Sequence, residues 1–193
     1  MKTPSFSPME VTFFCFSPNS RIEPQSLHID PYSWRFWRPS GLSVVPRGLP
    51  TYPFLVWSLF HHLRLFSNGD YCLFLAFSGS AVVHRAVVTP AYFRFPFMSK
   101  KDLQIGDVWT HPDHRGRGLA TYGLIEIVGR QWAEGRRFWY IVDVGNSASI
   151  RVAEKAGFVK CGEGTRTKRF GQNLFGAYEM ITQLELPESL KGK

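Results

Sequence analysis

The chain has 193 residues, of which 44% are apolar, enough for the core of one domain. Its net charge of +8 favours anionic partners, and because the basic residues are scattered we expect a phosphorylated ligand rather than nucleic acid. The three cysteines cannot all pair, and none lies in a Cys-x-x-Cys pair, which argues against a disulfide framework and a zinc site and for a reducing compartment.

The first 50 residues are rich in proline, serine and aromatic residues. We expect one short strand in this segment, Thr12–Phe16. The apolar run Val11–Phe16 is too short for a signal peptide core or a membrane span, so the sequence predicts a cytoplasmic protein without a membrane partner. The aromatic run Pro31–Pro39 has no clean helical or strand period, which predicts an ordered loop in which Trp34 and Trp37 pack against the core. The alternative is that the two tryptophans stack on a sugar or an aromatic ligand.

A helix and a β-hairpin are predicted next. Two apolar runs, Tyr71–Phe77 and Ala81–Thr89, are joined by a Ser-Gly-Ser turn, which is a hairpin signal. The loop Pro90–Met98 is rich in aromatic residues and should pack on the body of the protein. Before the hairpin, Pro53–Ser67 predicts a helix that ends at an Asn-Gly pair and has apolar residues along one face: Leu55, Leu59, Leu63 and Phe66.

The stretch 102–120, DLQIGDVWTHPDHRGRGLA, organises the rest of the chain. Leu103–Trp109 predicts a strand, a Pro-Asp pair ends it, and Leu119–Ala133 has the period of an amphipathic helix. The loop between them is Arg115-Gly116-Arg117-Gly118. A helix N-terminus leaves backbone N–H groups unpaired and attracts anions, glycines let a phosphate approach the backbone, and arginines add donors. The loop is therefore predicted to bind a diphosphate.

The last third of the chain predicts an alternation of strand and helix. Phe138–Val144 predicts a buried strand, and Ser149–Ala156 predicts a short helix with Asn146 or Ser147 as its cap. A closing pair of strands with a glycine-rich loop between them completes the chain: Phe158–Cys161, Ala177–Leu186 and the loop Glu163–Gly176.

Two blocks of this sequence carry a resemblance to a known family. Arg115–Ala120 resembles the Arg/Gln-x-x-Gly-x-Gly/Ala loop of the GNAT superfamily of N-acetyltransferases, which grips the pyrophosphate of acetyl-CoA. Asn146–Ser149 and Glu154–Phe158 resemble that family's second signature, an Asn-x-x-Ser helix start and a Glu-Lys-x-Gly-Phe helix end. Both blocks stand in the family's order and spacing around a strand, and the clear resemblance covers Leu103–Phe158.

The resemblance implies an α/β GNAT fold: a mixed central sheet with helices on both faces, and splayed fourth and fifth strands with the coenzyme's pantetheine arm between them. It implies one acetyltransferase domain over residues 1–193, with an acetyl-CoA-binding core at 103–158 and a variable N-terminal segment at 1–50 that shapes acceptor specificity. Acetyl-CoA is then a co-substrate, and no metal is expected. The residues that the resemblance places on the coenzyme are Trp109, Thr110, Arg115, Gly116, Arg117, Gly118, Leu119, Ala120, Asn146 and Ser149.

The sequence departs from the family pattern at one catalytic position. Many members carry a tyrosine just before Glu-Lys-x-Gly-Phe, placed to protonate the leaving thiolate, and here that residue is Ala153. Tyr140 and Ser149 are candidate substitutes, although Tyr140 is equally compatible with a core position. Candidate bases are His84, which otherwise lies on a solvated strand face, and Asp107, which otherwise pairs with an arginine. His111 is a third candidate base, although it is more typical of a loop residue, and a water-mediated base is also compatible with the family.

The implied function is acetyl-CoA-dependent transfer of an acyl group to a primary amine of a small molecule. A faint likeness to acetyltransferases of bacterial surface polysaccharide synthesis points to an amino sugar as the acceptor, and the oligomeric state, a homodimer included, stays open. The alternative is a catalytically inactive GNAT-like module that binds CoA or nucleic acid. A Rossmann-type enzyme is disfavoured, because Thr121 stands where its third glycine would be.

Overall fold

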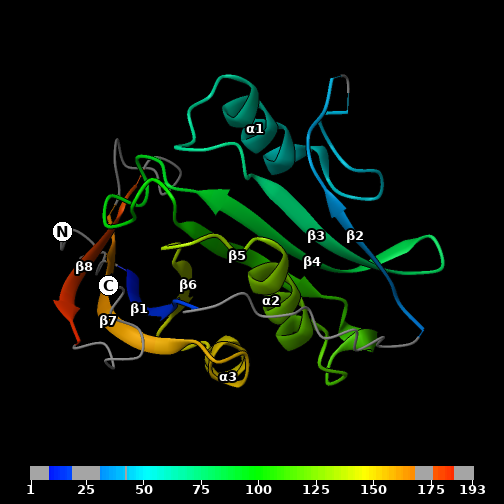
Figure 1. The fold of residues 1–193 in the computed structure, drawn as a ribbon. Helices are drawn as coiled ribbons and strands as arrows, with labels where there is room; N and C mark the ends of the chain where they lie inside the picture. Colours follow the sequence, from blue (N-terminus) through cyan, green and yellow to red (C-terminus); the bar gives the residue numbers. More distant parts are fainter. Residues whose placement is uncertain (1–8, 19–30, 42, 168–175, 185–193) are drawn as a thin grey trace, which may run out of the picture.

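The computed structural model describes residues 9–18, 31–41, 43–167 and 176–184. They form a mixed α/β fold built on one sheet (Figure 1). In chain order the elements are β1 (Met9–Phe16), β2 (Ser33–Trp37), α1 (Thr51–His62), β3 (Cys72–Ser78), β4 (Ala81–Pro90), β5 (Leu103–Thr110), the short 3₁₀ helix η1 (Pro112–His114), α2 (Leu119–Arg130), β6 (Phe138–Asp143), α3 (Ser147–Lys155), β7 (Val159–Arg166) and β8 (Tyr178–Gln183).

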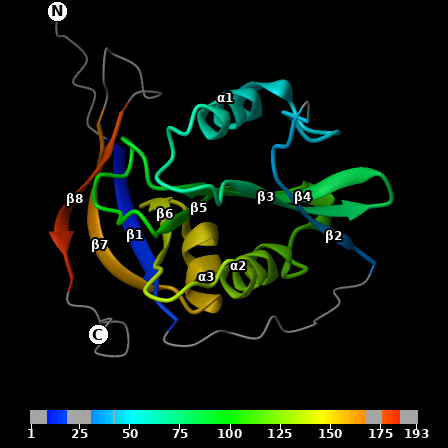
Figure 2. The same cartoon turned by 45° about the horizontal axis from the view of Figure 1, so that its top comes forward.

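The sheet formed by the described residues has eight strands in the order β2-β3-β4-β5-β6-β1-β7-β8. Neighbouring strands are antiparallel except β5 and β6, which run parallel. α1 lies on one face of the sheet, and α2 and α3 lie together on the other (Figure 2). The predicted α/β class, the mixed sheet and the helices on both faces are confirmed. Within the described ranges, no helix is both long and apolar enough to cross a membrane.

A hydrophobic core on each face of the sheet explains the continuous apolar runs of its central strands. In β3, Cys72 and Phe74 belong to the core under α2 and α3, whereas Leu73 and Leu75 belong to the core under α1. Side chains alternate along a strand, so a strand covered on both faces is apolar throughout. The predicted hairpin of β3 and β4 is confirmed, and Cys15 and Cys72 are buried free thiols.

The aromatic run 31–39 contains a strand, so the loop predicted there is wrong. β2 pairs with β3 along its whole length. Trp34 stacks on Phe74 with ring centroids 5.0 Å apart in one core, while Trp37 packs against the other core. Aromatic side chains on both faces hide the two-residue period by which a strand is recognised. The prediction that both tryptophans pack against the core is confirmed.

α1 buries a face other than the one marked by its leucines. It ends at His62 rather than Ser67. Phe54 and Ser58 are buried, whereas Leu55 and Leu59 are 45% and 52% exposed. Aromatic side chains of the loop after β4, such as Tyr92, pack beneath the helix against Trp57 and Phe60. The leucine period located the helix but not its buried side.

The first of the two closing strands is longer than predicted. β7 continues to Arg166, so the loop predicted from Glu163 onward is wrong at its start, and residues 168–175 of that loop lie outside the described residues. Gly162 and Gly164 lie within β7, and these positions require glycine because a Cβ on either would meet backbone atoms of β8. Glycine here marks close packing of two strands rather than a turn.

Asp102 joins the start of β5 to the start of β6 from a buried position. Asp102 is only 2% exposed. The carboxylate accepts hydrogen bonds of 2.7–3.2 Å from the Ser99 N–H and hydroxyl, the Arg137 N–H and the Trp139 indole N–H. These bonds fix the two parallel strands to each other at one end of the sheet.

Candidate active site

The two parallel strands pair at one end only. The ladder joins Leu103–Ile105 of β5 to Phe138–Tyr140 of β6 and extends no further. β5 nevertheless continues to Thr110 and β6 to Asp143. Beyond the ladder, the β6-facing backbone groups of β5 have no partner strand and are available to a ligand. The resemblance implied that the family's fourth and fifth strands separate, and β5 and β6 stand in their place here.

A bulge in β5 lies beside this opening. The ladder with β4 skips a position, so that Asp107 and Val108 together oppose a single β4 residue. Asp107 adopts a left-handed φ of 44°, which is strained for a residue with a Cβ. Its carboxylate forms a two-point ion pair with Arg85, at 2.8 and 3.1 Å. The arginine partner is one of the two roles predicted for Asp107.

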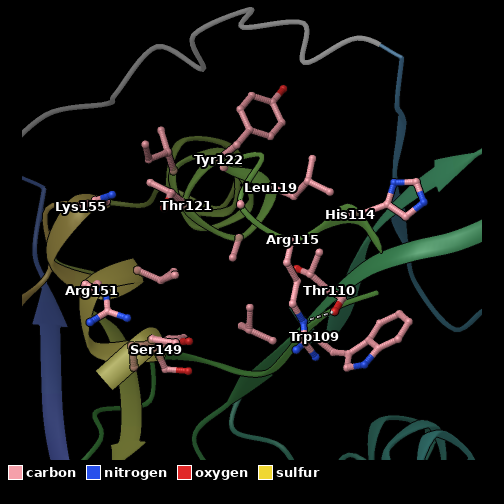
Figure 3. Close-up of a pocket in the computed structure, with 18 of the residues that line it drawn as sticks. Trp109, Thr110, His114, Arg115, Leu119, Thr121, Tyr122, Ser149, Arg151 and Lys155 are labelled. Carbon is pink, nitrogen blue, oxygen red and sulfur yellow. Dashed lines mark hydrogen bonds between the residues drawn. The ribbon is translucent and has the colours of Figure 1, made fainter. Parts of the chain in front are cut away.

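A pocket of about 880 Å³ lies between β5, α2 and α3 (Figure 3). Arg115 stands on one side of it, and Arg151 and Lys155 stand on the other. The structure brings nine of the ten predicted coenzyme residues into its lining: Trp109, Thr110, Arg115, Gly116, Gly118, Leu119, Ala120, Asn146 and Ser149.

The loop at the start of α2 is open to the pocket. Gly116 and Gly118 have φ values of 75° and 78°, and no atom lies within 4 Å of the place where a Cβ would stand on either. Gly118 is the N-cap residue of α2, and no side chain bonds to the first N–H groups of the helix. Arg115 Nε donates to the carbonyl of Thr110 at 3.1 Å. The loop can therefore accept an anion on free backbone N–H groups.

Arg117, the tenth predicted residue, is bonded to the body of the protein and does not line the pocket. Its guanidinium donates to the hydroxyl of Tyr32 at 2.9 Å and to the carbonyl of Asp113 at 3.2 Å. The Tyr32 hydroxyl in turn lies 2.9 Å from Nδ1 of His114, and Tyr32 itself is buried. Arg117 thus connects the loop to the segment that precedes β2 by a hydrogen bond.

α3 supplies the opposite wall of the pocket. The side-chain oxygen of Asn146 accepts the N–H of Ser149 at 3.0 Å, so Asn146 is the cap, one of the two predicted. Sequence reasoning missed Arg151 and Lys155, which line the pocket from the same helix. They are four residues apart and therefore share a helix face. Their spacing after the Asn-x-x-Ser start is the signal that could have found them.

Tyr140 lies where two cavities meet. It is 4% exposed and lines both the main pocket and a smaller cavity of about 280 Å³, which Asp107 also lines. Burial raises the pKa of Tyr140, and a hydrogen bond with Ser149 opposes that rise. The phenol is therefore protonated at neutral pH and can donate a proton. The structure brings Asp107 and Tyr140, two of the three catalytic candidates, to one cavity.

His84, the third candidate, does not lie on a solvated strand face, which corrects one of its two predicted roles. It is 0% exposed and lines neither cavity. It packs beneath α2, where a Cβ on Gly123 would lie 2.9 Å from its Nε2, and its Nδ1 is 2.8 Å from Oγ1 of Thr110. Burial, and then the charge of Arg85, lowers the pKa of His84 from 6.5 to about 4.

The lowered pKa of His84 predicts a loss of stability in mild acid. As the pH falls below 6.5, the unfolded chain binds a proton at this histidine, whereas the folded chain does so only near pH 4. The contribution of neutral His84 to the free energy of unfolding is fully present above pH 6.5 and is lost as the pH falls toward 4. It amounts to about 3 kcal/mol. Urea unfolding of the wild type and of His84→Leu, at steps between pH 7 and pH 4, measures it. Equal pH dependence in the two proteins would contradict the prediction.

The pocket suits a coenzyme with a diphosphate. It offers free N–H groups at the N-terminus of α2, cations on both sides, and a lining that leads to the opening between β5 and β6. Such a site can bind a diphosphate at one end and an extended amide chain along a strand edge. In the part of the chain that the structure describes, no group of three or more side chains could hold a metal ion.

The comparison with protein families decides the assignment. The acetyltransferase (GNAT) family matches residues 32–158, more than half of the chain, including the glycine loop, β6 and α3. The chain belongs to the acetyltransferase (GNAT) family. The characteristic chemistry of this family is acyl transfer from acetyl-CoA, which agrees with the open loop at α2.

Solved structures share the fold of this GNAT protein. A GNAT-family acetyltransferase structure from Novosphingobium aromaticivorans is 15% identical, with a TM-score of 0.55 over 82% of this chain and 62% of its own. A GCN5-related N-acetyltransferase from Sphaerobacter thermophilus is 18% identical, with a TM-score of 0.53 over 81% of this chain and 50% of its own. The chain therefore spans about half to six tenths of their lengths. No curated protein matched.

Proposed function

We propose that this GNAT protein transfers the acetyl group of acetyl-CoA to a primary amine of a small molecule. The observation that carries the proposal is the open N-terminus of α2, whose glycine loop faces a pocket leading to the opening between β5 and β6. Acetyl-CoA supplies an activated thioester when it is bound. The residues of the chain bind and orient the two substrates, which alone lowers the barrier substantially.

The proposed coenzyme site has cations on both sides and uncharged polar groups along α3. Arg115 and the N–H groups at the start of α2 bind the diphosphate, and the charges of Arg151 and Lys155 attract it from the opposite side. Asn146 and Ser149 offer polar atoms along the wall formed by α3. On the β5 side, backbone N–H groups without a partner strand can polarise the thioester carbonyl, as an oxyanion hole does.

Asp107 and Tyr140 are the proposed proton-transfer groups. Asp107 takes the proton of the amine, directly or through one water, from its place in the smaller cavity. Tyr140 donates its hydroxyl proton to the departing sulfur, in the role that Ala153 cannot fill. We do not assign proton abstraction to His84, because it is fully buried and lines neither cavity.

An amino sugar is the acceptor class that we propose to test first. The smaller cavity is lined by polar side chains that can bind sugar hydroxyls, among them Asp107, Asp143 and Tyr178. Trp109 lines the main pocket, and the face of its ring that is not stacked on the guanidinium of Arg85, 5.0 Å from the ring centre, offers an aromatic surface there. The earlier likeness to acetyltransferases of polysaccharide synthesis supports the same class.

A two-step experiment tests the function. Calorimetric titration with acetyl-CoA measures binding, and a thiol-release assay over a panel of amines, amino sugars included, measures transfer. Binding followed by steady release of CoA with one amine is the expected result. Binding without release on any amine favours the second candidate, a GNAT-like binding module, which the alanine at position 153 supports. Absence of acetyl-CoA binding would contradict the proposal.

Replacing Arg115 with alanine should weaken acetyl-CoA binding by about 1 kcal/mol or more, roughly five- to tenfold in Kd. The reason is the loss of a charge-assisted contact at the diphosphate end of the pocket. The matched control is Arg47→Ala, which removes an exposed arginine from the loop before α1, outside the pocket. Equal Kd values for the two variants in calorimetry would count against the role of the loop.

A further inference from the structure

Thr110 and His84 form a pair at the edge of the coenzyme pocket. They face each other across the β4–β5 ladder, and Nδ1 of the imidazole lies 2.8 Å from the Thr110 hydroxyl oxygen. Thr110 lines the pocket, whereas His84 is sealed from solvent. The hydroxyl therefore stands between a buried imidazole and an open ligand site.

The position of the imidazole proton decides the direction of this hydrogen bond. A neutral imidazole has one N–H and one lone pair. Nε2 of His84 has no hydrogen-bond partner among the described residues. A proton on Nε2 would leave a buried N–H without an acceptor, which is rarer in proteins than an unpaired acceptor. The geometry thus favours the proton on Nδ1.

Packing keeps the imidazole in this orientation. Nε2 faces α2 at Gly123, where the absence of a side chain leaves room for the ring. The ring of Trp34 meets the imidazole edge-on with centroids 5.8 Å apart. A ring flip would remove Nδ1 from Thr110 and direct a carbon at the hydroxyl instead, so the hydrogen bond selects one orientation as well as one tautomer.

With Nδ1–H as the donor, the Thr110 oxygen is an acceptor, and its own hydroxyl proton is left for another partner. We infer that His84 is a positioning residue that aims the Thr110 hydroxyl, as a hydrogen-bond donor, at an oxygen atom of the bound coenzyme. The inference rests on the proposed function of the pocket. Thr110 lies just before the glycine loop, and its carbonyl holds Arg115. The recipient is therefore a phosphate oxygen or a carbonyl oxygen of the pantetheine arm.

A double-mutant cycle on coenzyme affinity tests the inference. Thr110→Val keeps the shape of the side chain and removes the donor, and it should raise the Kd for acetyl-CoA roughly fivefold. Thr110→Ser, which keeps the hydroxyl, should bind like the wild type. In a His84→Leu background the effect of Thr110→Val should shrink toward none, because the hydroxyl is no longer aimed. His84→Asn, whose amide can donate from near the position of Nδ1, should restore the full effect of Thr110→Val.

A shorter substrate identifies the recipient atom. If the effect of Thr110→Val persists with S-acetylpantetheine, the recipient is a carbonyl oxygen of the arm, and if it disappears the recipient is a phosphate oxygen. Thermal unfolding of each variant verifies folding, and Thr110→Val and His84→Asn suffice if His84→Leu does not fold. A wild type that binds acetyl-CoA no better than Thr110→Val overturns the inference alone. A wild type that does not bind acetyl-CoA overturns the proposed function as well.

Discussion

Replacing Tyr140 with phenylalanine should lower the rate of acetyl transfer by roughly 10²- to 10⁴-fold, the range that a positioned general acid contributes. The variant keeps the ring, which contacts Phe158, and loses only the hydroxyl at the junction of the two cavities. Affinity for acetyl-CoA should change little, because the proposed binding contacts lie elsewhere in the pocket. Single-turnover thiol release measures the chemical step separately from product release.

Tyr71→Phe is the matched control for this experiment. Tyr71 is a buried tyrosine of the core under α1 and lines neither cavity, so its hydroxyl should have no effect on transfer. A Tyr140→Phe variant as fast as the control would show that the thiolate leaves without help from Tyr140. Ser149→Ala should fall between the two, because Ser149 holds the Tyr140 hydroxyl without meeting the sulfur itself.

Replacing Asp102 with alanine should lower the free energy of unfolding by about 3–5 kcal/mol. The carboxylate satisfies four donors in a buried site, and its removal leaves the Trp139 indole N–H and two backbone N–H groups without an acceptor. Urea or thermal unfolding of the variant measures the loss. Because these bonds join β5 to β6, the variant should also bind acetyl-CoA more weakly.

Two further aspartate variants separate this effect from a loss of charge. Asp113→Ala removes an exposed carboxylate and should change stability by less than about 0.5 kcal/mol. Asp102→Asn keeps the volume and one strong acceptor and should fall between the two. A loss below about 1 kcal/mol for Asp102→Ala would mean that water replaces the carboxylate among its donors.

Much of the fold could be predicted from local patterns, and the failures have identifiable physical causes. The hairpin of β3 and β4, the strand β5 and the helix α2 were found because period and turn chemistry agree there. The strand β2 was missed because Trp34 and Trp37 place aromatic side chains on opposite faces of the strand and so hide its two-residue period. The buried side of α1 was missed because it depends on aromatic side chains such as Tyr92, which come from a distant loop. No local period contains that information.

The lining of the main pocket was more predictable than the surroundings of the proposed catalytic groups. A glycine loop before a helix is a local device, so its residues could be read from the sequence. Arg117 was predicted to contact the coenzyme, and its bond to Tyr32 could not be foreseen because the two residues are 85 positions apart in the chain. Likewise, His84 is buried because a glycine of α2, Gly123, packs against it. Asp107 and Tyr140 line one cavity because the pairing of β5 with β6 ends at Tyr140. Such contacts arise only when the sheet assembles.

The bond between Arg117 and Tyr32 ties the glycine loop to the residue directly ahead of the edge strand β2. The conformation of the glycine loop therefore depends partly on Tyr32, which lies in a region of the sequence without a clear helical or strand period. We therefore expect substitutions just ahead of β2 to change the affinity of the proposed site for acetyl-CoA. Relatives that change the phenol should carry a compensating change at the second arginine of the loop.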